Sequence, residues 1–349
     1  MPFAIAILSA ALFGAATPAS KLLLADLTPF QLAGLLYLGA ALGTAPAAWR
    51  SGSPRLPDRG DRANRMRLLG AVVFGGIAGP VLLLLGLRSA EAASVSLWLN
   101  FELAATALLG VLLFREHLGP LGWGGVAAAF AGAAALSLPG GVAGLEPAIF
   151  VLAACLCWGL DNHLTALIDG LTPSQSTFWK GLAAGAANLA IGLALDPLAA
   201  GAAPLLAALL VGTLAYGASI VLYISAAQAL GATRAQIVFA SAPFFGVLGA
   251  VRWLGEPLAA VHLASGALFA AAIGLFALER HAHRHAHEPI EHEHAHRHDD
   301  GHHDHEHPGL PRSVWHAHRH RHEPLVHSHP HWPDLHHRHT HHGGYTAGR

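Results

Sequence analysis

The sequence is poor in charged side chains. Asp, Glu, Lys and Arg make up 12% of the 349 residues, whereas an ordinary soluble domain carries about 25%. Hydrophobic residues make up 53%, and the stretch from 68 to 278 is nearly free of charge. This composition excludes a soluble enzyme, and we expect neither catalysis nor a nucleic-acid partner.

Cysteine is also scarce. The two cysteines, Cys155 and Cys157, lie two positions apart in an apolar run, which puts them about 200° apart around a helix. They cannot chelate one ion together, and burial in apolar surroundings explains them better. The lack of further cysteines argues against a copper(I) site or a closed structural zinc site.

Long apolar runs dominate the rest of the chain. A bilayer core requires about 20 apolar residues per helix. The first run, residues 3 to 24, lacks the basic leader of a signal peptide and is kept as a span. The sequence predicts an all-α polytopic membrane protein with ten transmembrane helices, at residues 3 to 24, 30 to 49, 68 to 88, 92 to 113, 120 to 138, 147 to 168, 174 to 195, 204 to 228, 233 to 254 and 258 to 278.

Two motifs occur twice. Leu27-Thr28-Pro29-Phe30-Gln31 recurs as Leu171-Thr172-Pro173-Ser174-Gln175. Arg115-Glu116 follows Ala93-Ser94-Val95 as Gly255-Glu256 follows Thr233-Arg234-Ala235, at a constant offset of 140. We infer two five-helix repeats, residues 1 to 138 and 147 to 278. Because five is odd, the second repeat is inverted, and a site is expected between the halves.

Lys and Arg outside the spans predict the orientation. Six of the twenty fall between Arg50 and Arg67, and eight follow Phe276. With a cytoplasmic N-terminus, the other face receives only Lys21, Arg88 and Arg252. We expect a multi-pass protein of the inner (plasma) membrane with both termini in the cytoplasm.

Several short motifs recur in a characteristic order and spacing over residues 1 to 278. They are Gly14-Ala15-Ala16-Thr17-Pro18, Leu99-Asn100-Phe101-Glu102, Phe114-Arg115-Glu116-His117, Trp158-Gly159-Leu160-Asp161-Asn162, and Ala242-Pro243-Phe244 before Gly255-Glu256-Pro257. In this order and spacing the chain resembles the drug/metabolite transporter superfamily, EamA type. The resemblance implies ten helices in two repeats and a secondary carrier of small organic solutes. Glu102-Leu103 departs from the more usual Glu-Pro pair.

Glu102 lies at the centre of the fourth run, where an ionisable side chain costs about 2.5 to 3.5 kcal/mol to insert. On a continuous helix its one-turn neighbours are Trp98 and Thr106. One face would then offer a carboxylate between an indole and a hydroxyl. Two interpretations stay open: a substrate or proton site, and a neutral Glu hydrogen-bonded between helices.

Lys180 is the only cation deep in a helix of the second half. Asp161 of the sixth run is a candidate partner, because pairing would relieve both charges. Asn162 adds a polar group beside Asp161, and Thr17 with Pro18 occupies the matching place in the first run. A binding role and a structural ion pair between helices are both open.

Residues 279 to 349 have a different composition. Of the 27 histidines, 24 lie between His281 and His342, with few apolar residues among them. The sequence His-Ala-His-Arg-His occurs three times, beginning at residues 281, 294 and 316. Because no core can form there, the sequence predicts a disordered, low-complexity cytoplasmic tail.

Neutral imidazole is a ligand for nickel, zinc and cobalt, so the tail is a candidate for buffering or sensing a divalent metal. A pH-responsive polycation and a functionally neutral tail are the alternatives. No cofactor is required for the membrane part. The candidate ligands are His281, His283, His285, His287, His292, His294, His296, His298, His302, His303, His305, His307, His316, His318, His320 and His322.

Two functions follow from these features. The first is a secondary transporter of a small organic solute, such as an amino acid, another metabolite or a drug-like compound, that works by alternating access and couples to protons. The second is a divalent metal transporter whose tail collects or senses the ion. The spans disfavour the second, because only His163 lies well inside them. Expected partners are the lipid bilayer, the solute and a metal ion, with a homodimer as a further candidate.

Overall fold

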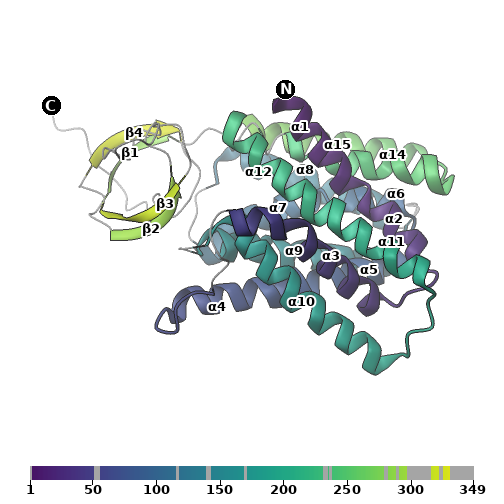
Figure 1. Ribbon diagram of the computed structural model, residues 1–349. Helices are drawn as coiled ribbons and strands as arrows, with labels where there is room; N and C mark the ends of the chain where they lie inside the picture. Colours follow the sequence, from purple (N-terminus) through teal and green to yellow (C-terminus); the bar gives the residue numbers. More distant parts are fainter. Residues whose placement is uncertain are drawn as a thin grey trace.

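The computed structural model describes a helical body and four short strands (Figure 1). Its described residues are 2–50, 56–114, 118–138, 143–168, 171–230, 235, 238–278, 282–287, 291–296, 316–321 and 325–330. The predicted all-α membrane architecture is confirmed. Within these residues, nine helical stretches are long and apolar enough to cross a membrane.

The first repeat contains spans one to five. The first, third and fourth spans are each divided into consecutive helical segments. In chain order the elements are α1 Pro2–Gly14, α2 Ala16–Leu23, α3 Pro29–Arg50, α4 Arg62–Gly70, η1 Ala71–Ala78, α5 Gly79–Ser89, α6 Ala92–Trp98, α7 Phe101–Phe114 and α8 Pro120–Ser137.

The second repeat contains spans six to ten. The ninth predicted span corresponds to the shorter helix α14, and residues 231–234, 236 and 237 lie outside the described part of the chain. The elements are α9 Leu145–Ala166, α10 Pro173–Leu195, α11 Ala202–Val211, η2 Gly212–Ala218, α12 Ser219–Leu230, α14 Ala242–Leu254 and α15 Ala260–Leu278.

The repeated Thr-Pro-x-Gln motif begins the second helix of each repeat. In the first repeat, Thr28 N–H donates to Gln31 Oε1 at 3.2 Å, and Gln31 N–H donates to Thr28 Oγ1 at 3.4 Å. Thr172 and Gln175 form the same two bonds at 3.1 and 3.3 Å. Each pair is a capping box, which satisfies amides that have no partner within the helix.

The third span of each repeat contains a π-helical segment, η1 in the first and η2 in the second. Their positions, 71–78 and 212–218, correspond at nearly the offset of 140 seen in the sequence. A π-turn widens the helix and changes which carbonyls are available to other groups. The two repeats therefore share an irregular helix as well as their capping boxes.

The two halves meet along α3 and α10, the second helix of each repeat. A Cβ atom added at Gly34 would lie 2.6 Å from Leu189 N, and one at Gly185 would lie 2.7 Å from Leu38 N. One at Gly181 would lie 2.8 Å from Tyr37 O. Only glycine permits this backbone approach, and small residues four positions apart, such as Gly181 and Gly185, allow membrane helices to pack closely.

Each repeat also inserts its first helix into the other half. Helix α9 packs against η1, α5 and α7, whereas α1 packs against α12 and α14. Helices α8 and α15, the last helix of each repeat, pack against each other. Polar residues on α9 therefore face the first repeat, close to its π-helical segment.

The tail differs from the predicted disorder in four segments, β1 Ala282–His287, β2 Glu291–His296, β3 His316–Arg321 and β4 Leu325–Pro330. They form two antiparallel pairs, β1 with β4 and β2 with β3, and lie apart from the helical body (Figure 1). In β1, β2 and β3 His alternates with other residues, which matches the period of a strand, and the backbone register of β2 and β3 pairs Glu291 with Arg321 and Glu293 with Arg319.

Candidate functional site

An ion pair joins α9 to α10 inside the helical body. Lys180 Nζ lies 2.5 Å from Asp161 Oδ2, and the side chains are 16% and 7% exposed. Thr165 Oγ1 donates to the other oxygen, Asp161 Oδ1, at 2.9 Å. The structure thus brings together the two charges that the sequence suggested as partners.

The π-helical segment η1 provides a carbonyl beside this pair. Gly75 O accepts hydrogen bonds from Tyr37 Oη and, at 3.0 Å, from Trp158 Nε1. A side chain at Gly75 would overlap the Asp161 carboxylate. Asn188 Nδ2 donates to the next carbonyl, Gly76 O, at 2.9 Å. Spans two, three, six and seven therefore meet at this turn.

Glu102 adds a second carboxylate from the fourth span. Asn162 Nδ2 donates to Glu102 Oε1 at 3.0 Å and to Thr106 Oγ1 at 3.2 Å. Because Asn162 follows Asp161 in α9, this bond joins Glu102 to the helix that carries the ion pair. We call Glu102, Asp161, Asn162 and Lys180 the charged cluster. Two acids and one cation give it a net charge of minus one when all are ionised.

Aromatic rings continue from the charged cluster toward the first, eighth and ninth spans. The rings of Tyr37 and Tyr216 lie 6.0 Å apart, and Phe13 lies 5.5 Å from Tyr216. Phe239 lies 5.2 Å from Phe13 and 5.0 Å from Tyr223. These five rings, the aromatic row, come from both repeats and place an apolar surface next to the charged cluster.

Trp98 lies elsewhere, contrary to the prediction that it shares a face with Glu102. Its side chain is fully buried, and Trp98 Nε1 donates to Ala133 O of the fifth span at 3.3 Å. The helix is interrupted after Trp98, where Asn100 Nδ2 donates to Leu97 O at 3.1 Å. Because this break changes the rotation between α6 and α7, the one-turn relation does not hold.

Thr17 and His163 also lie outside the charged cluster. Thr17 is buried in α2, and no hydrogen bond joins it to Asp161 or Lys180 in the described part of the chain. His163 Nε2 lies 2.9 Å from Thr106 O, and its ring stacks on Phe114 at 4.4 Å. His163 is therefore a buried histidine packed between α7 and α9.

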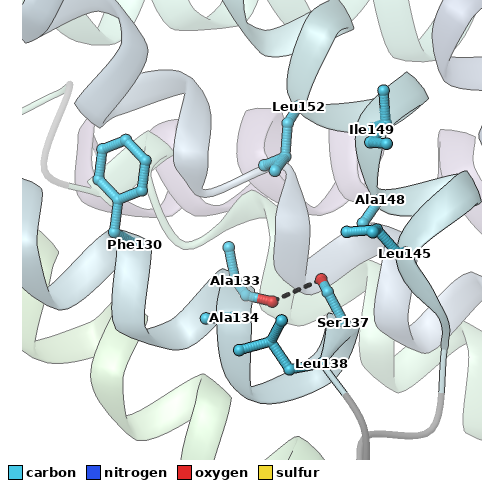
Figure 2. A pocket seen from close by; sticks show the side chains of 9 residues that line it. All are labelled: Phe130, Ala133, Ala134, Ser137, Leu138, Leu145, Ala148, Ile149 and Leu152. Carbon is cyan, nitrogen blue, oxygen red and sulfur yellow. Dashed lines mark hydrogen bonds between the residues drawn. The ribbon is translucent and has the colours of Figure 1, made fainter.

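A separate apolar hollow lies between α8 and α9 (Figure 2). Its volume is about 180 Å³. The Ser137 hydroxyl at its edge donates to Ala133 O at 2.7 Å, so the hollow suits hydrocarbon better than a polar solute. Its lining residues are Phe130, Ala133, Ala134, Ser137, Leu138, Leu145, Ala148, Ile149 and Leu152.

Sequence reasoning missed Tyr37, Trp158 and Gly75 as parts of the site. Trp158 belonged to a recognised motif, but nothing in its spacing indicated a bond to a backbone carbonyl. Tyr37 was a single polar ring in an apolar span. Both rings reach Gly75 O through tertiary contacts between residues far apart in the sequence.

Comparison with known proteins agrees with this architecture. A family model described as the EamA-like transporter family matches residues 2–138 and 146–278. The chain belongs to this family. It is therefore a multi-pass membrane protein and a transporter of small solutes.

A solved structure titled "Crystal structure of protein" has the same fold. It aligns with a TM-score of 0.56 at 17% sequence identity, covering 79% of this chain and 94% of that chain. At this identity the match establishes the fold alone. No curated protein matches the chain.

Among the described residues, no group of three or more His, Cys, Asp or Glu side chains is arranged to hold a metal ion. Seven of the predicted tail ligands, His281, His298, His302, His303, His305, His307 and His322, lie outside the described residues. The other nine belong to the four strands.

Proposed function

We propose that the chain is a secondary transporter of a small organic solute, with its binding site at the charged cluster. The observation that carries this proposal is the partly buried ion pair of Asp161 and Lys180, next to the Asn162–Glu102 hydrogen bond between the two repeats. Charges in a bilayer are costly, so their retention favours a function. The interface between inverted repeats is where such carriers bind their solutes.

The charged cluster suits a solute with polar or charged groups. Lys180 can bind an anionic group, and Glu102 or Asp161 can bind a cationic one. The aromatic row offers a neighbouring surface for an apolar part of the solute. A solute must replace the Asp161–Lys180 contact to use either charge fully, which links binding to a rearrangement of α9 against α10.

Glu102 is the proposed proton-coupling residue. Its described hydrogen-bond partner is the neutral Asn162 amide, whereas Asp161 contacts a cation. A carboxyl group without a direct cationic partner can change protonation without breaking an ion pair. We expect Glu102→Gln to fold normally and to lose the pH dependence of transport.

Transport in proteoliposomes tests these proposals. Amino acids, other small metabolites, nickel, cobalt and zinc would be screened for uptake and efflux, with and without a proton gradient. Asp161→Asn and Lys180→Met should lower transport at least about tenfold, the effect of losing one charged contact. Glu146→Gln, at an exposed acid beginning α9, is the control. Normal transport by both cluster variants would refute the site.

We further propose that the tail binds divalent metal. The strand registers support this, because they place histidines opposite each other at alternate positions, and alternate residues share one face of a strand. Imidazole is a ligand for nickel, zinc and cobalt. The facing pairs are His283 with His329, His285 with His327, His292 with His320, His294 with His318, and His296 with His316.

Full-length protein and a chain ending at Arg280 would be compared to test the tail. We expect several nickel, zinc or cobalt ions per full-length molecule after desalting, and essentially none on the shortened chain. Binding should fall below about pH 6.5, since protons compete for imidazole. The shortened chain should still move the organic solute. If the full-length protein carries metal and truncation abolishes that movement, the metal-transporter alternative replaces ours.

A further inference from the structure

The short turn between α5 and α6 is held by two charged side chains from other spans. Lys21 Nζ, near the end of α2, donates to Leu87 O at 2.7 Å and to Ala90 O at 2.8 Å. The Glu256 carboxylate, between α14 and α15, accepts N–H bonds from Ala92 and Ala93, both at 2.8 Å. Both repeats therefore hold this one turn.

Each contact has a clear electrostatic basis. The last carbonyls of a helix carry partial negative charge and attract a cation, whereas the first amides carry partial positive charge and attract an anion. Lys21 satisfies the end of α5, and Glu256 satisfies the start of α6. Hydrogen bonds to charged groups are about twice as strong as neutral ones, so these contacts fix the turn between the halves.

A buried histidine adds a third contact. His262 of α15 is 3% exposed, and its Nδ1 accepts a hydrogen bond from Ala259 N–H at 3.0 Å. The Nε2 atom therefore faces Ser94 Oγ of α6 at 3.0 Å as the donor in the neutral ring. Glu91 Oε2 lies 3.8 Å from the same nitrogen. The loop and helix that follow α14 thus hold the first turn of α6, through its backbone amides and through the Ser94 side chain.

We call Lys21, Glu256 and His262, with the turn they hold, the latch. It lies at the distal face, the membrane face reached by the ends of α2 and α5. Just beneath it, Ser96 is fully buried, and its hydroxyl has no hydrogen-bond partner within the described residues. A side chain at Gly246 of α14 would collide with Ser96 Oγ. Helices α6 and α14 therefore pack closely here, because Gly246 of α14 meets the small Ser96 side chain of α6.

We propose that the latch is the distal gate of the carrier and that release of Ala92 and Ala93 by Glu256 opens it. This proposal rests on alternating access, part of the proposed function. The contacts that hold the start of α6 to the second repeat are polar and can exchange with water, whereas close backbone packing at several glycines joins α3 to α10. Water entering between α6 and α14 would also satisfy the Ser96 hydroxyl, which lowers the cost of opening.

Thiol accessibility tests the gate without a known substrate. Ser96→Cys would be labelled with a membrane-impermeant maleimide applied to the distal face, with Cys155 and Cys157 of the parent measured as background. Labelling should be slow in Ser96→Cys alone. Adding Glu256→Ala should raise the rate about tenfold, through a larger open population, and Glu256→Gln should have a smaller effect.

Glu146→Gln is the matched control, because it removes an exposed acid near the same face. Each variant would be checked for a single peak in size-exclusion chromatography, and Lys21→Met gives a second opening variant if Glu256→Ala fails to fold. Equal labelling rates with and without the latch residues would overturn the proposal. Because labelling needs no solute, the labelling result does not depend on whether the charged cluster binds the solute. Failure of the gate proposal would likewise leave the transport test of the charged cluster unaffected.

Discussion

Gly75 determines how closely the Asp161 carboxylate approaches the π-helical segment. The position has no side chain, its carbonyl accepts two ring donors, and the carboxylate occupies the space a methyl group would need. The charged cluster therefore requires that residue 75 carry only a hydrogen atom in place of a side chain. At the residue scale, the site depends as much on this small group as on the charges.

Gly75→Ala should displace the Asp161 carboxylate and weaken its contact with Lys180. We expect a loss of about 1 to 3 kcal/mol in stability, the usual cost of overpacking, together with reduced transport. Gly274→Ala is the control, because a Cβ there meets nothing within 4 Å. Thermal unfolding in detergent and proteoliposome transport measure the two effects. Equal stability of both variants would contradict the packing argument.

A double substitution separates binding from structure at the Asp161–Lys180 pair. Lys180→Met alone leaves a buried acid unpaired, and we expect it to cost about 3 to 5 kcal/mol. Lys180→Met combined with Asp161→Asn should recover most of this stability, because neither charge remains. Transport should stay lost in the double variant. If thermal unfolding and transport both recover, the pair is structural and the solute binds elsewhere.

The sequence predicted the ionisable residues of the cluster but not its complete surroundings. Asp161 and Lys180 were identifiable because isolated charges in apolar spans require partners. The placement of Trp98 was wrong, because the interruption at Asn100 changes the helix rotation by an amount that spacing does not reveal. The role of Tyr37 depends on tertiary contact with Gly75, which no local pattern encodes.

At the scale of elements, the repeated pentapeptide is explained by its hydrogen bonds. Thr28 with Gln31 and Thr172 with Gln175 begin equivalent helices in the same way. The sequence predicted that spans begin near these motifs. It did not predict the π-helical segments η1 and η2, because apolar composition fixes the existence of a span but not its hydrogen-bond pattern.

Removing one cap tests this explanation. Thr172→Ala deletes the hydroxyl that accepts the Gln175 N–H bond, so we expect a loss of about 1 kcal/mol in stability. Thr177→Ala, one turn further along α10, deletes only a bond to Pro173 O and should be nearly neutral. Unfolding midpoints compare the two variants. A larger effect at Thr177 would show that capping does not explain the motif.

At the scale of the whole molecule, ten spans place both ends of the helical body at one face. The Lys and Arg distribution predicts that this face is cytoplasmic. Reporter fusions at residues 58 and 310 should therefore both report a cytoplasmic position. A periplasmic signal from the fusion at residue 310 alone would mean an odd number of spans, and periplasmic signals from both would mean reversed insertion.

The inverted arrangement gives the two capping boxes opposite surroundings. The helix begun by Thr28 starts in one leaflet, and the one begun by Thr172 starts in the other, so the same short sequence meets two sets of lipid headgroups. Each box satisfies its amides with its own threonine and glutamine and needs nothing from the lipid. A five-helix ancestor whose helices begin with such capping boxes could insert in either direction and keep these helix starts hydrogen-bonded. Duplication into two oppositely oriented halves requires this property.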